Sequence, residues 1–128
     1  MLNKKVIETE EAPAAIGPYS QGILVDSLVF TSGQLPVNSD GIMPGTVEEQ
    51  TRQSLKNIEA VLKKSGCSMD DIIKTTVFLN DMNDFSSMNS VYEKFFSKGL
   101  YPARSAIEVG RLPKDALVEI EAVALKQK

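Results

Sequence analysis

Apolar and small residues recur every three or four positions in the segment after Thr46, which predicts an amphipathic helix. The stripe consists of Val47, Thr51, Ser54, Leu55, Ile58, Val61 and Leu62. Thr46 and Glu49 have the spacing of a capping box, in which each side chain accepts a hydrogen bond from the other residue's free backbone N–H. Gly66 is suited to end the helix, because glycine adopts the left-handed conformation of a C-cap without steric cost.

A second helical pattern runs from about Asp84 to Ser97. Five large residues fall on one side of it, namely Phe85, Met88, Tyr92, Phe95 and Phe96. Gly99 and Pro102 follow closely, and both residue types commonly stand just beyond the end of a helix. This spacing predicts a second amphipathic helix that ends before Gly99.

The remaining apolar segments are short and alternate or carry many β-branched residues, which predicts strands. They cover residues 6–7, 20–25, 27–31, 71–79, 103–109 and 117–125. The second and third form a hairpin about Asp26, and turn formers at 112–115 separate the last two. The order is therefore three strands, a helix, a strand, a helix and two strands.

This order predicts an α+β fold in which one domain, residues 1–128, folds as a mixed six-stranded sheet with two helices on one face. A domain of this length buries a modest core, so small enzymes often build their sites between subunits. If both helices cover the same face, the opposite face of the sheet needs a partner. A second copy of the chain is the simplest candidate.

Charged residues alternate with apolar ones in the last two predicted strands. Period-2 alternation places Glu119 and Glu121 on one face, although ionised carboxylates resist burial in such apolar surroundings. One strand earlier, Arg104 shares a face with Ala106 and Glu108. The pattern has two interpretations, a surface ion-pair ladder across neighbouring strands or a functional site made of Arg104 and one glutamate.

Three further positions have both a structural and a functional interpretation. Tyr19 stands between a Gly-Pro turn and a strand, where most tyrosines are half-buried packing residues. Gly33 follows a strand, and a glycine there indicates a bulge or turn, or a place where another backbone or a ligand approaches closely. Cys67 has no activating neighbour in the sequence and is interpreted as structural.

The composition limits the chemistry that the chain can perform. The 128 residues carry a net charge of −3 and include no histidine and one cysteine. Without histidine the commonest acid–base group at neutral pH is missing, and the usual zinc ligand sets are excluded. Catalysis then falls to carboxylates, arginine, lysine, tyrosine, hydroxyls and the backbone, and we expect no metal and no cofactor.

Charge and hydropathy also limit the partners. Neutralising phosphates needs clustered Lys and Arg, and the sequence has no run of five basic residues, so no nucleic acid is expected. No apolar run is long enough to cross a bilayer, and the acidic run after the first residues is unlike a secretory signal, so no membrane is expected. A single cysteine permits no internal disulfide and predicts a cytoplasmic protein.

Taken together, these segments resemble the RidA/YjgF family of reactive intermediate deaminases. The matching blocks are residues 12–22, 31–36, 52–57, 74–79, 83–85, 101–109, 111–114 and 119–121, in family order over almost the whole chain. The resemblance implies a chorismate-mutase-like fold, a six-stranded sheet with two helices, assembled as a homotrimer around a central barrel. It also implies three sites in the clefts between subunits.

The resemblance also implies roles for individual residues. Arg104 is similar to the arginine that clamps the substrate carboxylate, and Glu119 to the carboxylate that positions and activates the attacking water. Tyr19, with Arg104 and Glu119, is expected to be catalytic. The positions expected to line the substrate and water site, besides Arg104, are Ser32, Gly33, Asn89 and Ala106. The family commonly has cysteine where this chain has Ala106, so a role for a thiol there is not expected.

The function implied is the hydrolysis of reactive enamine/imine intermediates to 2-oxo acids and ammonia, a form of metabolite damage control. The substrates would be 2-imino acids such as 2-iminobutanoate and 2-iminopropanoate. One alternative is a non-catalytic protein that binds 2-oxo acids in the same inter-subunit cleft. Two others are an RNA-cleaving inhibitor of translation, which the absent histidine and the acidic charge disfavour, and a chaperone-like activity that leaves no readable motif.

Overall fold

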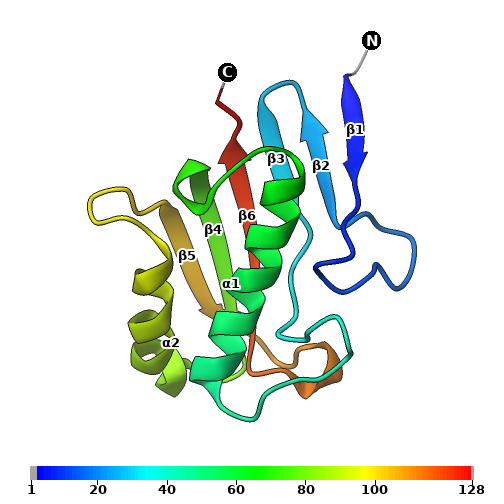
Figure 1. The fold of residues 1–128 in the computed structure, drawn as a ribbon. Helices are drawn as coiled ribbons and strands as arrows, with labels where there is room; N and C mark the ends of the chain where they lie inside the picture. Colours follow the sequence, from blue (N-terminus) through cyan, green and yellow to red (C-terminus); the bar gives the residue numbers. More distant parts are fainter. Residues whose placement is uncertain (1–2, 128) are drawn as a thin grey trace.

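The protein folds as a six-stranded sheet with two helices on one face, and its computed structural model describes residues 3–127 (Figure 1). The strands are β1 (Lys4–Ile7), β2 (Gly22–Val25), β3 (Leu28–Thr31), β4 (Ile72–Leu79), β5 (Ala103–Glu108) and β6 (Val118–Leu125), and the helices are α1 (Val47–Lys64) and α2 (Phe85–Tyr92). Their order across the sheet is β1-β2-β3-β6-β4-β5. Among the strands of the described residues only the β4–β5 pair is parallel, so the predicted mixed α+β sheet is confirmed.

The predicted hairpin about Asp26 joins β2 and β3. Asp26 has φ +51°, a left-handed conformation that Asp tolerates better than most residues, and this allows a tight antiparallel turn. Strand boundaries lie within about two residues of the predicted ones, which is the usual uncertainty of element ends.

Helix α1 begins and ends close to where the sequence predicts. The Thr46 hydroxyl accepts a hydrogen bond from the backbone N–H of Glu49 at 3.2 Å. The reciprocal bond, from the backbone N–H of Thr46 to the Glu49 carboxylate, is not among the hydrogen bonds of residues 3–127, so half of the predicted capping box is formed. Ser65 caps the C-terminus, and Gly66 turns the chain away with φ +85°.

Helix α2 is shorter than predicted. The α-helical hydrogen bonding stops at Tyr92, and the chain continues as a 3₁₀ turn, η3 (Glu93–Phe95), before Phe96 adopts an extended conformation. Tightening of the last turn into a 3₁₀ helix is common at helix ends. Phe96 is buried, and its ring centroid lies 4.9 Å from that of Tyr92, so the aromatic side of the helix packs as the pattern requires.

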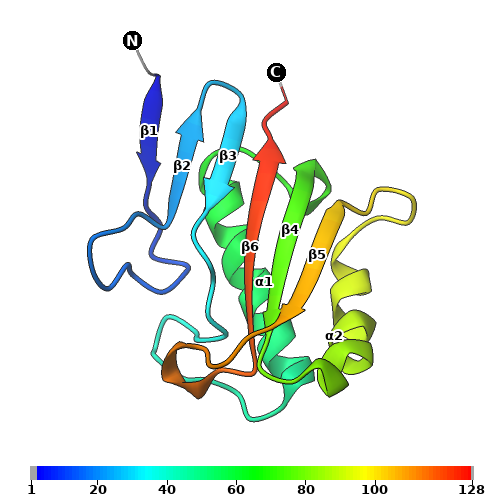
Figure 2. The same cartoon turned by 180° about the vertical axis from the view of Figure 1, so that it is seen from behind.

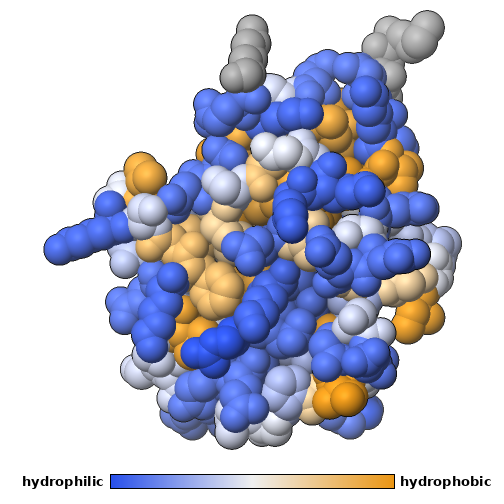
Figure 3. Space-filling model, in the orientation of Figure 1, coloured by the Kyte–Doolittle hydropathy of each residue, from blue (hydrophilic) through white to orange (hydrophobic). Residues whose placement is uncertain are grey.

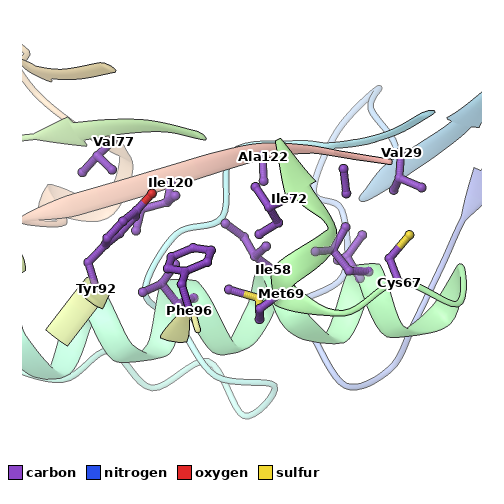
Figure 4. Close-up of a cluster of buried hydrophobic side chains, with 14 of the residues drawn as sticks. Val29, Ile58, Cys67, Met69, Ile72, Val77, Tyr92, Phe96, Ile120 and Ala122 are labelled. Carbon is purple, nitrogen blue, oxygen red and sulfur yellow. The ribbon is translucent and has the colours of Figure 1, made fainter. Parts of the chain in front are cut away.

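The core lies between the sheet and α1. Alternate residues of β4 and β6, such as Val77, Ile120 and Ala122, point toward the helix, where Ile58 is completely buried. Figure 4 shows these side chains directed toward one another from the sheet and from α1. Seen from the helix side, hydrophilic side chains cover most of the outer surface (Figure 3). None of the described helices has the length and apolarity needed to span a membrane.

Within residues 3–127, no helix lies on the opposite face of the sheet, as Figure 2 shows. Large apolar side chains stand on this open face with between 39% and 55% of their surface exposed, namely Val6, Phe30, Ile107 and Leu125. Scattered apolar residues are normal on a protein surface, but a row along several neighbouring strands is typical of an interaction surface. The uncovered face that the sequence analysis predicted is therefore present.

We predict that Ile58→Ala lowers the free energy of unfolding by about 2–5 kcal/mol, because it leaves a cavity between α1 and the sheet. Urea denaturation at a fixed protein concentration measures the change. The matched control is Glu59→Ala, at the next, exposed position of the same helix, which should stay within about 0.5 kcal/mol of the parent. Equal effects of the two substitutions would contradict the described packing.

Candidate active site

Arg104 lies on edge strand β5 beneath α2. Its Nη1 donates a hydrogen bond to Oδ1 of Asn89 at 2.7 Å. Its guanidinium carbon lies 5.3 Å from the ring centroid of Phe85 and 4.8 Å from that of Tyr92. These distances are within the range of cation–π attraction, so the guanidinium is held by the helix instead of extending into open solvent.

Ala106 follows Arg104 two residues along the same strand, and period-2 alternation places both on the helix-covered side. Ala106 is partly buried and packs against the hydrophobic core. Its side chain is a methyl group, so only its backbone can offer hydrogen bonds to a ligand.

Glu119 lies on β6, on the open face. A Cβ atom at Gly33 would overlap the carboxylate of Glu119, so the close approach predicted at this glycine is made by a side chain of the same sheet. Burial raises the pKa of Glu119, and the negative charge of Glu121 raises it further. The result is a carboxylate with a stronger affinity for protons than an exposed glutamate has.

Tyr19 and Ser32 lie in the loops that border Gly33. The Tyr19 hydroxyl accepts a hydrogen bond from the backbone N–H of Ile16 at 3.3 Å, while about half of the Tyr19 residue remains exposed. The Ser32 hydroxyl donates to the carbonyl of Ser20 at 2.5 Å and so ties the two loops together. Tyr19 and Gly33 line a small cavity of about 70 Å³. The structure therefore brings Tyr19, Ser32, Gly33 and Glu119 to one region.

Arg104 and Glu119 lie on opposite faces of the sheet. Arg104 pairs with Thr75 of β4, which pairs in turn with the buried Ala122 of β6, so this row faces the helices. Glu119 pairs with Phe78 of β4, in the alternate row that faces the open side. The two functional groups predicted to meet are therefore separated by the sheet within one chain.

The interpretation as an ion-pair ladder on neighbouring strands is wrong, because β4 lies between β5 and β6. Neighbouring strands are about 4.8 Å apart, so two strands of separation place these backbones roughly 10 Å apart. Within one chain, the sheet keeps Arg104 and Glu119 apart. The candidate site consists of two halves, one around Arg104, Asn89 and Ala106 and the other around Glu119.

Sequence reasoning missed the aromatic surroundings of Arg104. Phe85, Asn89 and Tyr92 all contact its guanidinium, and their spacing of four and then three residues places them on one face of α2. The pattern indicated only a side that packs against the molecule. The spacing of these residues shows that they share one face of the helix. It does not identify Arg104 of β5 as the residue that this face contacts.

Lys114 was also missed. It lines the same cavity as Tyr19 and Gly33, and it and Asp115 have φ +59° and +56°, an uncommon conformation for residues with a Cβ atom. The sequence predicted a turn here, and the turn η4 (Pro113–Asp115) confirms it, although the positive φ of Lys114 departs from a regular 3₁₀ helix. The sequence did not show that this turn places Lys114 at the cavity.

Within residues 3–127, no group of three or more His, Cys, Asp or Glu side chains is arranged to hold a metal ion. Cys67 is buried, and burial raises the pKa of its thiol, which favours the unreactive protonated form. The structural interpretation of this cysteine is consistent with that environment.

The fold and the site define an α+β sheet protein that displays an arginine on one face and a glutamate on the other. Residues 9–126 match the sequence model of a family described as Endoribonuclease L-PSP. The 2-iminobutanoate/2-iminopropanoate deaminase of Escherichia coli K12 is 51% identical over 126 residues, which cover 96% of this chain and 98% of that protein.

Solved structures agree with the sequence matches. Escherichia coli TdcF with bound serine superposes with a TM-score of 0.91 at 49% identity, covering 96% of this chain and 99% of that one. The Escherichia coli YjgF gene product has the same TM-score, identity and coverage. The chain belongs to this family, the RidA/YjgF family that its motifs resemble.

We predict that Glu121→Gln lowers the pKa of Glu119, because the substitution removes a neighbouring negative charge. Carboxyl ¹³C NMR titration of the parent and the variant measures the change. Glu59→Gln, which removes an equal charge from the outer side of α1, is the control and should leave the Glu119 titration unchanged. An equal Glu119 midpoint in the parent and in Glu121→Gln would contradict the described proximity of the two carboxylates.

Proposed function

We propose that the protein hydrolyses 2-imino acids, such as 2-iminobutanoate and 2-iminopropanoate, to 2-oxo acids and ammonia. The observation that carries the proposal is the pair of prepared groups on opposite faces of the sheet, a restrained arginine and a carboxylate of raised pKa. The printed name of the relative from Escherichia coli, at 51% identity, supports this reaction class.

The active assembly is a homotrimer around a central barrel, with a site in each cleft between subunits. The open sheet face supports it, because its exposed apolar residues would be removed from water by neighbouring copies. The opposite placement of Arg104 and Glu119 supports it independently, because one copy supplies the arginine and the next supplies the glutamate. Each cleft then contains one complete pair.

In the reaction, Arg104 binds the substrate carboxylate with the donors that Asn89 leaves free. Two parallel N–H···O bonds fix the plane of the carboxylate, which a lysine ammonium cannot do. The imine carbon next to the carboxylate is electrophilic, and protonation of its nitrogen increases this. Because the substrate is already reactive, orientation supplies most of the acceleration.

Glu119 of the neighbouring copy accepts a proton from water as the oxygen attacks the imine carbon. The attack forms a C–O bond and gives a tetrahedral carbinolamine. Glu119 then returns its proton to the nitrogen, the C–N bond breaks, and ammonia leaves with the electron pair of that bond, while the hydroxyl oxygen loses its proton to solvent water and forms the C=O bond of the 2-oxo acid. The backbone groups of Gly33 and Ala106 hold the imine nitrogen or the water, and Tyr19 and Ser32 line the cleft.

A non-catalytic role as a 2-oxo-acid-binding or regulatory protein is the second candidate. The structure of TdcF with bound serine shows that a relative binds a small amino acid, which is compatible with binding alone. The two functions differ in one measurement, since a binding protein would take up 2-oxobutanoate and release no ammonia from imines.

The family description names an endoribonuclease, but this chain is poorly equipped for that reaction. It has no histidine and a net charge of −3. Glu119 and Glu121 share the open face and would repel a phosphodiester backbone. We therefore propose a small imino or 2-oxo acid, and no nucleic acid, as the partner of the site.

We predict that Arg104→Ala lowers kcat/KM for 2-iminobutanoate by roughly 100-fold or more, because the carboxylate loses its bidentate partner. An amino-acid oxidase generates the imine, and semicarbazide competes for it, so a faster loss of trapped imine reports the activity. Arg52→Ala, which removes an arginine from α1, is the control, and circular dichroism checks the fold of both variants. Full activity of Arg104→Ala would contradict the assignment.

We also predict that two inactive variants restore activity when they share an oligomer. When equal amounts of Arg104→Ala and Glu119→Ala chains assemble at random into trimers, about a quarter of all the clefts combine the intact arginine of one chain with the intact glutamate of the next. Co-refolding equal amounts should therefore recover roughly a quarter of the parental activity. Co-refolding either variant with the double variant is the control and should recover none. No recovery in the first mixture would show that the groups do not act across an interface.

A further inference from the structure

Three residues on one face of α2 contact the guanidinium of Arg104. Phe85, Asn89 and Tyr92 are spaced by four and three residues, and each contacts this one group. Asn89 supplies a 2.7 Å hydrogen bond and the two rings supply aromatic faces. An amphipathic helix needs only apolar bulk on its packed side, so this convergence goes beyond what packing requires.

Tyr92 is itself fixed in place from two directions. Its hydroxyl forms a hydrogen bond of 2.7 Å with Oγ1 of Thr75, which is completely buried. Thr75 is the β-sheet partner of Arg104, so the strand that flanks the arginine also fixes the ring that contacts it. On its other side the ring packs against Phe96 at 4.9 Å. Because these contacts restrict the Tyr92 ring, the ring can in turn restrict the Arg104 side chain beside it.

An arginine that binds a carboxylate bidentately must present its planar fork in one orientation. A free arginine side chain is rich in rotamers, and ordering such a chain upon binding reduces affinity. Aromatic rings near the guanidinium carbon limit its movement, and the hydrogen bond to Asn89 fixes one end of the fork. The remaining donors are left for a ligand.

We propose that Tyr92 and Phe85 are positioning residues, which hold the Arg104 guanidinium in the orientation that receives the carboxylate of a 2-imino or 2-oxo acid. The inference rests on the proposed function, because it assumes that Arg104 is the carboxylate-binding group. Tyr92 and Phe85 act through the arginine and need not contact the substrate. Their effect belongs to substrate affinity, since the carboxylate is bound equally in the ground state and in the transition state.

Substitution of the rings tests the proposal through two readouts, the Kd of the product 2-oxobutanoate by calorimetry and the KM and kcat for 2-iminobutanoate. Tyr92→Leu should raise Kd and KM by roughly 3- to 30-fold while kcat changes by less than about 3-fold. Tyr92→Phe keeps the ring and should recover most of the affinity. Phe85→Leu, at the start of α2, is a second route to the same result if Tyr92→Leu folds poorly.

Ile58→Ala is the control for a general loss of stability. Ile58 is completely buried in α1, whereas the rings over which the guanidinium lies are those of Phe85 and Tyr92. It should lower the thermal stability as Tyr92→Leu does, with a Kd within about 2-fold of the parent.

Several outcomes would overturn the inference. Parental affinity in both Tyr92→Leu and Phe85→Leu would show that the rings do not position Arg104. An equal loss of affinity in Ile58→Ala would show that general loosening of the core explains the effect. If the parent protein neither turns over imines nor binds 2-oxobutanoate, the proposed function and the inference fail together. If the parent binds and the ring variants bind equally well, the inference alone fails.

Discussion

The site depends on the two-residue period of a β-strand. Because successive side chains of a single-layered sheet point to opposite faces, the registers of β4 with β5 and β6 place Arg104 with the helices and Glu119 on the open side. In the proposed function, chemistry that needs both groups takes them from two chains, and the apolar residues of the open face offer a surface by which chains can associate.

Each half of the site is prepared by the part of the fold on its own side. On the covered face, α2 belongs to the hydrophobic core through Met88 and Tyr92, and the same helix restrains the arginine. On the open face, Gly33 has no side chain, so the Glu119 carboxylate can lie against the backbone at this position. A domain of this size buries a modest core, so dividing a site between two such surfaces preserves packing that a deep internal pocket would interrupt.

The sequence predicted well which segments form helices and strands, but it predicted poorly which strands are neighbours in the sheet. Periodicity identified both helices and all six strands, since it reports which side of an element is buried. It could not report that β4 lies between β5 and β6, because strand order depends on long-range pairing, and the ion-pair ladder was wrong for this reason. For Gly33 the sequence left open a bulge or turn and a close approach by a backbone or a ligand, whereas the group that lies against it, the Glu119 side chain, comes from a strand about 85 residues later.

The two halves of the candidate site, around Arg104 and around Glu119, also have complementary charges. In a subunit alone, burial and the charge of Glu121 raise the pKa of Glu119, so its carboxylate binds a proton more strongly than that of an exposed glutamate. In the proposed cleft the guanidinium of a neighbouring copy approaches, and an opposite charge favours the ionised form. When the substrate binds, its carboxylate neutralises that guanidinium. The pKa of Glu119 then rises again, so Glu119 accepts a proton more readily when an imine is present for water to attack. A chain without histidine can in this way obtain a base matched to its reaction from a glutamate.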